Sequence, residues 1–162
     1  MKKLIIINGV AGVGKTTVCK ELYKSIFNSV WLDGDWCWMM NPFVVNEENK
    51  RMVEGNITFL LKNYLNNSSY KYVIFNWVIG NKKIFEIILR ELDDLEFQLY
   101  KISLTSSSEL LRKRMLEDGR TEEQIENSIN NLRLYDDMDT LKIDTTNISV
   151  RSTVNKILEM IK

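Results

Sequence analysis

One short segment constrains the fold more than any other part of the chain. Gly9–Thr16 reads GVAGVGKT, which satisfies the pattern GxxxxGK[ST]. The apolar run Leu4–Ile7 precedes this segment, and the apolar residues Val18, Leu22 and Ile26 follow it at helical spacing from Lys15 onward. Glycines allow such a loop to curl with its backbone N–H groups pointing inward, and the N-terminus of the next helix adds positive dipole. The segment therefore predicts a phosphate-binding loop between a strand and a helix.

Each residue type in this loop has an expected partner on a nucleotide. Lys15 is expected to bridge the outer phosphates, and the Thr16 hydroxyl to ligate Mg²⁺. We therefore expect ATP and Mg²⁺ as cofactors. The residues expected to contact the nucleotide here are Gly9, Val10, Ala11, Gly12, Val13, Gly14, Lys15, Thr16 and Thr17.

The remaining chain alternates short apolar runs with stretches of helical periodicity. Helix N-termini are expected at Asn46, and at Thr121 with Gln124, which form a capping-box pattern. This alternation predicts an α/β fold with a parallel sheet covered by helices on both sides. The expected strands are Leu4–Ile7, Ser29–Leu32, Tyr70–Ile79, Phe97–Leu104 and Leu141–Asp144.

Two carboxylates follow the second expected strand, in the sequence Asp33-Gly34-Asp35. Doubly wound sheets bind ligands at the carboxyl ends of their strands, so both residues should face the same cleft as the phosphate loop. Asp33 is a candidate to hold Mg²⁺ directly or through water, and Asp35 to orient or deprotonate an acceptor hydroxyl. Both are also candidates for substrate binding. The alternative is a turn in which both side chains cap backbone N–H groups.

An aromatic and methionine-rich stretch comes directly after these carboxylates, from Trp36 to Phe43. Flat rings and flexible thioethers suit a partly apolar small molecule, which makes Trp36 and Trp38 candidates for substrate binding. The same side chains could equally fill a gap under a neighbouring helix.

Composition excludes several classes of function. Lysine plus arginine and aspartate plus glutamate each number 22, so no global basic field exists for nucleic acid or an anionic membrane. Histidine is absent, which removes histidine-based triads and the usual zinc sites. Two cysteines without paired spacing indicate a reducing, cytoplasmic setting. Residues 1–162 show no internal boundary and are expected to form one domain, either monomeric or homodimeric.

These residues together resemble the small P-loop kinases, the group that includes shikimate, gluconate, nucleoside-monophosphate and antibiotic-phosphorylating kinases. The phosphate loop, the Asp33-Gly34-Asp35 segment and Ile143–Asn147 carry the likeness. The resemblance implies a three-layer P-loop NTPase fold with a five-stranded parallel sheet and a helical lid at about residues 112–133.

The resemblance also assigns roles outside the loop. Arg114, Arg120 and Arg133 lie in or beside the lid segment and are implied to stabilise transition-state charge. By the same likeness, Thr145, Thr146 and Asn147 are expected near the nucleotide base.

One departure from the pattern concerns the third strand, where Asn76 stands at the position at which many P-loop proteins carry a Walker-B aspartate. An amide can hold a metal-bound water but brings no charge. Asn76 is also a candidate for substrate binding, because it ends a strand at the expected cleft.

Two functions remain open at this point. The first is ATP-dependent phosphoryl transfer to a small-molecule acceptor, with no nucleic acid or membrane partner. The second is a nucleotide-binding regulatory or switch protein with little or no kinase activity, which Asn76 leaves open.

Overall fold

The central sheet of the computed structural model, which describes residues 1–162, has five parallel strands. Their order across the sheet is β2-β3-β1-β4-β5. The apolar β1 lies in the centre, as expected for a strand buried on both faces. The strands are β1 (Lys2–Asn8), β2 (Ser29–Asp33), β3 (Tyr72–Trp77), β4 (Phe97–Thr105) and β5 (Leu141–Asp144).

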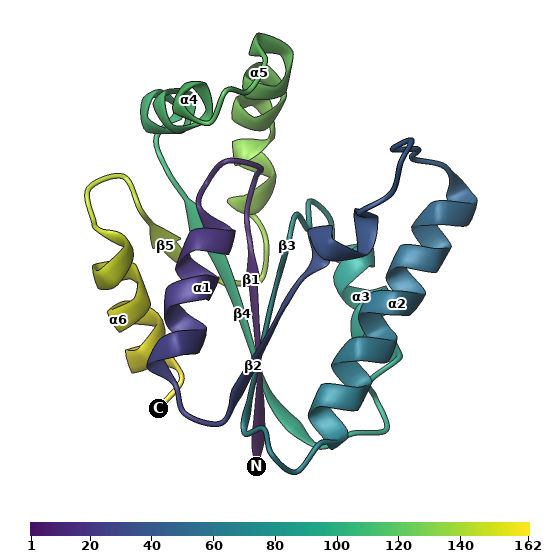
Figure 1. The fold of residues 1–162 in the computed structure, drawn as a ribbon. Helices are drawn as coiled ribbons and strands as arrows, with labels where there is room; N and C mark the ends of the chain where they lie inside the picture. The colour runs from purple at the N-terminus through teal and green to yellow at the C-terminus, as the bar shows by residue number, and fades with distance from the viewer.

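Helices cover both faces of this sheet, which makes three layers. Figure 1 shows α1 and α6 together on one face and α2 with α3 on the other, while α4 and α5 stand beyond the carboxyl ends of the strands. The helices are α1 (Lys15–Ser25), α2 (Glu47–Asn66), α3 (Lys82–Arg90), α4 (Ser108–Glu117), α5 (Glu122–Asn131) and α6 (Val150–Met160), with short 3-10 helices η1 (Gly34–Trp38) and η2 (Leu132–Tyr135). The expected three-layer α/β fold is confirmed.

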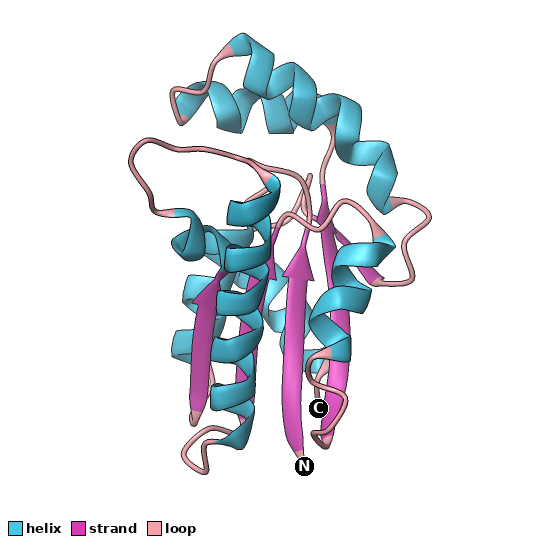
Figure 2. Cartoon of the chain, turned by 90° about the vertical axis from the view of Figure 1, so that its right-hand side faces the viewer, coloured by secondary structure: helices cyan, strands magenta, loops and turns pink.

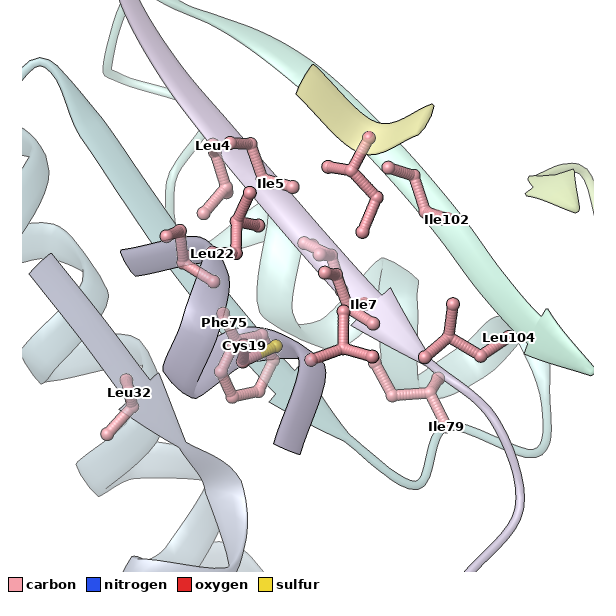
Figure 3. Close-up of a cluster of buried hydrophobic side chains, with 14 of the residues drawn as sticks. Leu4, Ile5, Ile7, Cys19, Leu22, Leu32, Phe75, Ile79, Ile102 and Leu104 are labelled. Atoms are coloured by element: carbon pink, nitrogen blue, oxygen red, sulfur yellow. The ribbon is translucent and has the colours of Figure 1, made fainter. Parts of the chain in front are cut away.

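The core lies between the sheet and its helices. Figure 3 draws part of it where α1 covers β1: Cys19 and Leu22 come from the helix, and Ile5 and Ile7 from the strand. All four side chains are fully buried. Leu22 is one of the residues of the predicted apolar stripe on α1, so the helical periodicity identified the face that packs on the sheet.

Local capping explains where the helices begin. The Asn46 side chain accepts a hydrogen bond from the backbone N–H of Asn49 at 2.8 Å, and thereby caps α2. Thr121 and Gln124 form the reciprocal capping box expected at the start of α5. None of the helices has the length and apolar character needed to cross a bilayer.

The helices α4 and α5 form a hairpin over the carboxyl edge of the sheet (Figure 2). Arg112 on α4 makes ion pairs with Glu122 and Glu126 on α5. At the opposite end of the sheet, the Lys3 ammonium donates to the carbonyl oxygen of Ile161. Both chain ends therefore lie far from the helical hairpin (Figure 1).

Candidate functional site

The loop Gly9–Thr16 joins the end of β1 to the first turn of α1, and its backbone demands the glycines that it contains. Gly9 has φ +149°, and a Cβ there would stand 2.7 Å from the carbonyl oxygen of Leu104. Gly14 has φ +104° and lies at the N-terminus of α1. Side chains rarely adopt these conformations, so the glycines allow the loop to curl and to approach β4 closely.

Lys15 is held against the loop from which it comes. Its Nζ donates to the carbonyl oxygens of Gly9 at 3.0 Å and Val10 at 2.9 Å, and only 7% of the residue is exposed. Burial lowers the pKa of Lys15 from its ordinary 10.5 to about 8, while Asp35 and Asp33 act in the opposite direction. Anionic phosphates beside this ammonium would favour its charged form, so the side chain is suited to a phosphate ligand.

The two carboxylates have separate environments. Asp33 is 3% exposed, and its Oδ2 accepts from the Thr16 hydroxyl at 2.7 Å. Its Oδ1 accepts from the backbone N–H of Asp35 at 3.0 Å. Asp33 thus caps the turn, as the alternative for this segment expects of it, and also contacts the phosphate loop.

Gly34 allows this turn to lie directly on β3, because a Cβ at Gly34 would be 2.5 Å from Cγ of Trp77. The Asp35 side chain is then directed to a cavity at the phosphate loop. Burial and the nearby Asp33 raise the pKa of Asp35, whereas Lys15, Arg120 and Trp77 lower it. A carboxylate with a raised pKa is a stronger base than an exposed one.

The phosphate loop borders two adjoining cavities of similar size. The first has a volume of about 220 Å³ and brings Lys15, Thr16 and Asp35 together with Arg120 from the turn after α4. The second has a volume of about 230 Å³ and lies between α4 and the loop after β5, with Arg114 and Thr145 in its wall. The residues common to both are Gly12, Gly14, Thr17 and Asp118.

Arg114 lies across the second cavity. Its guanidinium donates to the carbonyl oxygen of Val13 at 3.1 Å and to the Thr145 hydroxyl at 3.2 Å. Thr145 in turn donates to the carbonyl oxygen of Thr105 at 3.0 Å. Arg114 therefore connects the phosphate loop, α4 and the segment after β5 in one wall.

The structure separates other candidates from these two cavities. Arg133, Thr146 and Asn147 line a third hollow of about 740 Å³ that includes no residue of the phosphate loop. The Thr146 hydroxyl accepts from the backbone N–H of Ser107 at 2.8 Å, so it joins the loop after β5 to the start of α4. These three residues lie together, but not with Lys15.

The aromatic candidates also lie outside the first cavity. Trp36 packs on Trp31 with ring centroids 4.9 Å apart and borders a surface hollow beside Lys20. Trp38 packs on Phe43 with centroids 5.8 Å apart. Trp38 is partly buried against the core, which fits the expectation that these side chains fill a gap under a neighbouring helix.

Asn76 is almost completely buried, and its Oδ1 accepts from Nε1 of Trp31 at 2.7 Å. The protein contains no group of three or more acidic, histidine or cysteine side chains that could hold a metal ion by themselves. Thr16 and Asp33 offer the hard oxygen atoms that Mg²⁺ prefers, and Mg²⁺ commonly takes its other ligands from phosphates and water. The residues present therefore fit a magnesium ion that arrives with a nucleotide.

Sequence reasoning did not single out two residues that line the first cavity, Val78 and Asp118. Asp118 directly precedes Gly119, whose φ is +72°. Both residues lie in the turn that reverses the chain between α4 and α5. The Asp-Gly-Arg sequence is a turn signal, and it could have indicated that Asp118 accompanies Arg120. Val78 follows β3 by one residue and has no comparable signal.

Comparison with known proteins places this geometry in context. The model of a family described as an AAA domain matches residues 5–134. No curated protein sequence matches the chain. Solved structures that resemble it share low identity and nearly full coverage, so they show the fold alone.

Three such structures illustrate the range. A tunicamycin resistance protein from Deinococcus radiodurans is 18% identical with a TM-score of 0.72, and the match covers 99% of this chain and 96% of that one. A gluconokinase from Sinorhizobium meliloti 1021 is 13% identical with a TM-score of 0.70, with 98% and 90% covered. The APS kinase of Mycobacterium tuberculosis, solved with AMPPNP and APS, is 12% identical with a TM-score of 0.69, with 99% and 96% covered.

Proposed function

The chain belongs to the AAA-domain family whose model covers residues 5–134, and on that premise we propose that it transfers a phosphoryl group from ATP to a hydroxyl of a small molecule. One observation carries the proposal: Lys15, Asp35 and Arg120 converge on the cavity at the phosphate loop. Two cationic side chains and one carboxylate are the groups that transfer to a hydroxyl requires. The kinases among proteins of similar fold support it further.

The two cavities suggest how the nucleotide is placed. The phosphates occupy the cavity of Lys15, where backbone N–H groups of the loop and the N-terminus of α1 favour anions. The base and sugar occupy the adjoining cavity beside Arg114, whose guanidinium plane can stack on a base. Because both cavities share Gly12 and Thr17, one ligand can span them.

The transfer step uses the chain's own side chains in distinct roles. Asp35 accepts the proton of the acceptor hydroxyl as its oxygen bonds to the γ-phosphorus. The bond from that phosphorus to the bridging oxygen breaks, and ADP leaves with the electron pair. Lys15 and Arg120 stabilise negative charge on the transferred group. Thr16 and Asp33 would hold the Mg²⁺ that accompanies the phosphates, and that ion would supply further charge neutralisation.

The test is release of ADP by the purified chain in the presence of candidate acceptors. A kinase releases ADP well above its background rate only when its acceptor is present, and the Asp35→Asn protein loses that stimulation while it still binds ATP. A protein that binds ATP tightly, releases no ADP with any hydroxylated acceptor, and changes oligomeric state or partner binding with nucleotide is instead a switch. That result would refute the kinase proposal.

A further inference from the structure

The hydrogen bond between Trp31 and Asn76 fixes which end of the amide faces the site. Asn76 lies on β3 in register with Asp33 on β2, so the two side chains are neighbours. The indole Nε1 of Trp31 lies 2.7 Å from Oδ1 of Asn76. An indole N–H can only donate, so the amide atom that meets it must be the oxygen.

The indole that makes this bond is itself held in place. The Trp31 ring packs against Tyr23 of α1, with centroids 5.9 Å apart, and against Trp36 of η1, with centroids 4.9 Å apart. Rotation of the Asn76 amide would turn its NH₂ toward the indole N–H, so two donors would face each other in a part-buried position. That arrangement leaves the indole N–H without its acceptor, which is costly away from water.

The other end of the amide has a different environment. No protein acceptor pairs with Nδ2 of Asn76, although the residue is only 1% exposed. Ser106 Oγ is the only fully buried side-chain polar atom of the protein without a partner, so Nδ2 of Asn76 is not completely sealed from solvent. Asn76 thus directs its oxygen to Trp31, and the group on the other side of the amide is a hydrogen-bond donor.

We infer that the hydrogen bond from Trp31 keeps the Asn76 oxygen from serving a metal ion, so that Thr16 and Asp33 are the only protein side chains that support Mg²⁺ at the phosphate loop. This inference rests on the nucleotide site of the proposed function. A metal-bound water is a donor whose lone pair is engaged by the metal, so it can pair with the Asp33 carboxylate but not with an NH₂ group. The Thr16 hydroxyl, which donates to Asp33, keeps lone pairs for the metal.

The experiment measures how much Mg²⁺ is needed for half-maximal tightening of ADP binding, by calorimetry, in the wild-type chain and four variants. Trp31→Phe keeps an aromatic ring but removes the N–H donor, so the amide can turn its oxygen toward a metal-bound water. The Mg²⁺ requirement should fall several-fold, by roughly the effect of one outer-shell hydrogen bond. Tyr23→Phe is the matched control, since it retains the ring that packs on Trp31 and should leave the requirement unchanged.

Two further variants test the ligand set directly. Asp33→Asn should raise the Mg²⁺ requirement by about 10–100-fold, the usual effect of losing an outer-shell carboxylate. Asn76→Ala should leave it within about twofold, because the lost group is a donor that the metal shell does not use. Thermal melting without ligand verifies that each variant is folded. If the cavity left by Asn76→Ala unfolds that protein, the Mg²⁺ requirement of Trp31→Phe still tests the inference.

Either of two results overturns the inference. One is an Asn76→Ala protein whose Mg²⁺ requirement rises as far as that of Asp33→Asn, which would show that the Asn76 oxygen does serve the metal. The other is a Trp31→Phe protein with the wild-type requirement. Both readouts use ADP binding, so they remain interpretable if no acceptor is ever phosphorylated. Absence of nucleotide binding would refute the proposed function and this inference together.

Discussion

Binding of a nucleotide should cause Lys15 to take up a proton when the pH is near 8. In the free protein, burial holds the pKa of Lys15 at about 8 instead of 10.5, a difference of about 3 kcal/mol in favour of the neutral amine. Bound phosphates bring several negative charges to this amine and return its pKa toward the ordinary value. The protein should therefore take up about 0.1 proton per nucleotide at pH 7, about 0.5 at pH 8 and about 0.9 at pH 9.

The sign of the pH dependence follows from this uptake. Below about pH 8 Lys15 is already charged in the free protein, and affinity for ADP should not depend on its ionisation. Above pH 8 binding must supply the proton, so affinity should weaken by about tenfold per pH unit until the bound-state pKa is reached. The terminal phosphate of ADP titrates near pH 6, and it contributes little in this range.

Calorimetry of ADP binding in two buffers with different ionisation enthalpies measures the uptake directly. Lys15→Arg is the control, because a guanidinium stays protonated throughout this range and has no proton to gain. Uptake should vanish in that variant even if affinity is reduced. The reasoning is refuted if the wild-type chain takes up no proton between pH 8 and 9, or if Lys15→Arg takes up as much.

Three other perturbations separate the proposed roles. Asp35→Asn should reduce transfer at least about a hundredfold, as loss of a general base does, and leave ADP binding intact; full transfer activity would show that Asp35 is not the base. Arg120→Ala should reduce kcat more than ATP affinity, and equal losses in kcat and affinity would make Arg120 a simple binding residue. Lys113→Ala, which removes an exposed cation of α4, should change neither. Arg114→Ala should weaken ATP but not inorganic triphosphate, as titrations with both ligands will show; equal weakening would place Arg114 at the phosphates instead of the base.

The elements of the fold were predictable because their signals are local. Apolar spacing identified α1 and its buried face, and side-chain caps marked the starts of α2 and α5 at Asn46 and Thr121. The phosphate loop was equally clear, since glycine is strongly favoured where φ is positive and where another backbone lies close, as at Gly9. Neighbouring residues determine most of these features, although the approach of Gly9 to Leu104 depends on β4.

The site residues that were harder to place depend on contacts between distant segments. The loop after β5 directs Thr145 to one cavity and Thr146 to another hollow. No periodicity in the sequence predicts that these neighbours face different cavities. The direction of Trp36 depends on how η1 turns on β3 through the contact of Gly34 with Trp77. The orientation of Asn76 depends on Trp31, which lies 45 residues earlier in the chain.

The position of the chain ends determines how this protein can be handled. Lys3 donates a hydrogen bond to Ile161 at the amino ends of the strands, while the phosphate loop and the α4–α5 hairpin lie at their carboxyl ends (Figure 1). A tether at either end can therefore anchor the molecule to a sensor surface with its cleft directed into solution. Because the two ends adjoin, a short peptide could also join them, and the chain could be reopened at an exposed turn to give a circular permutant.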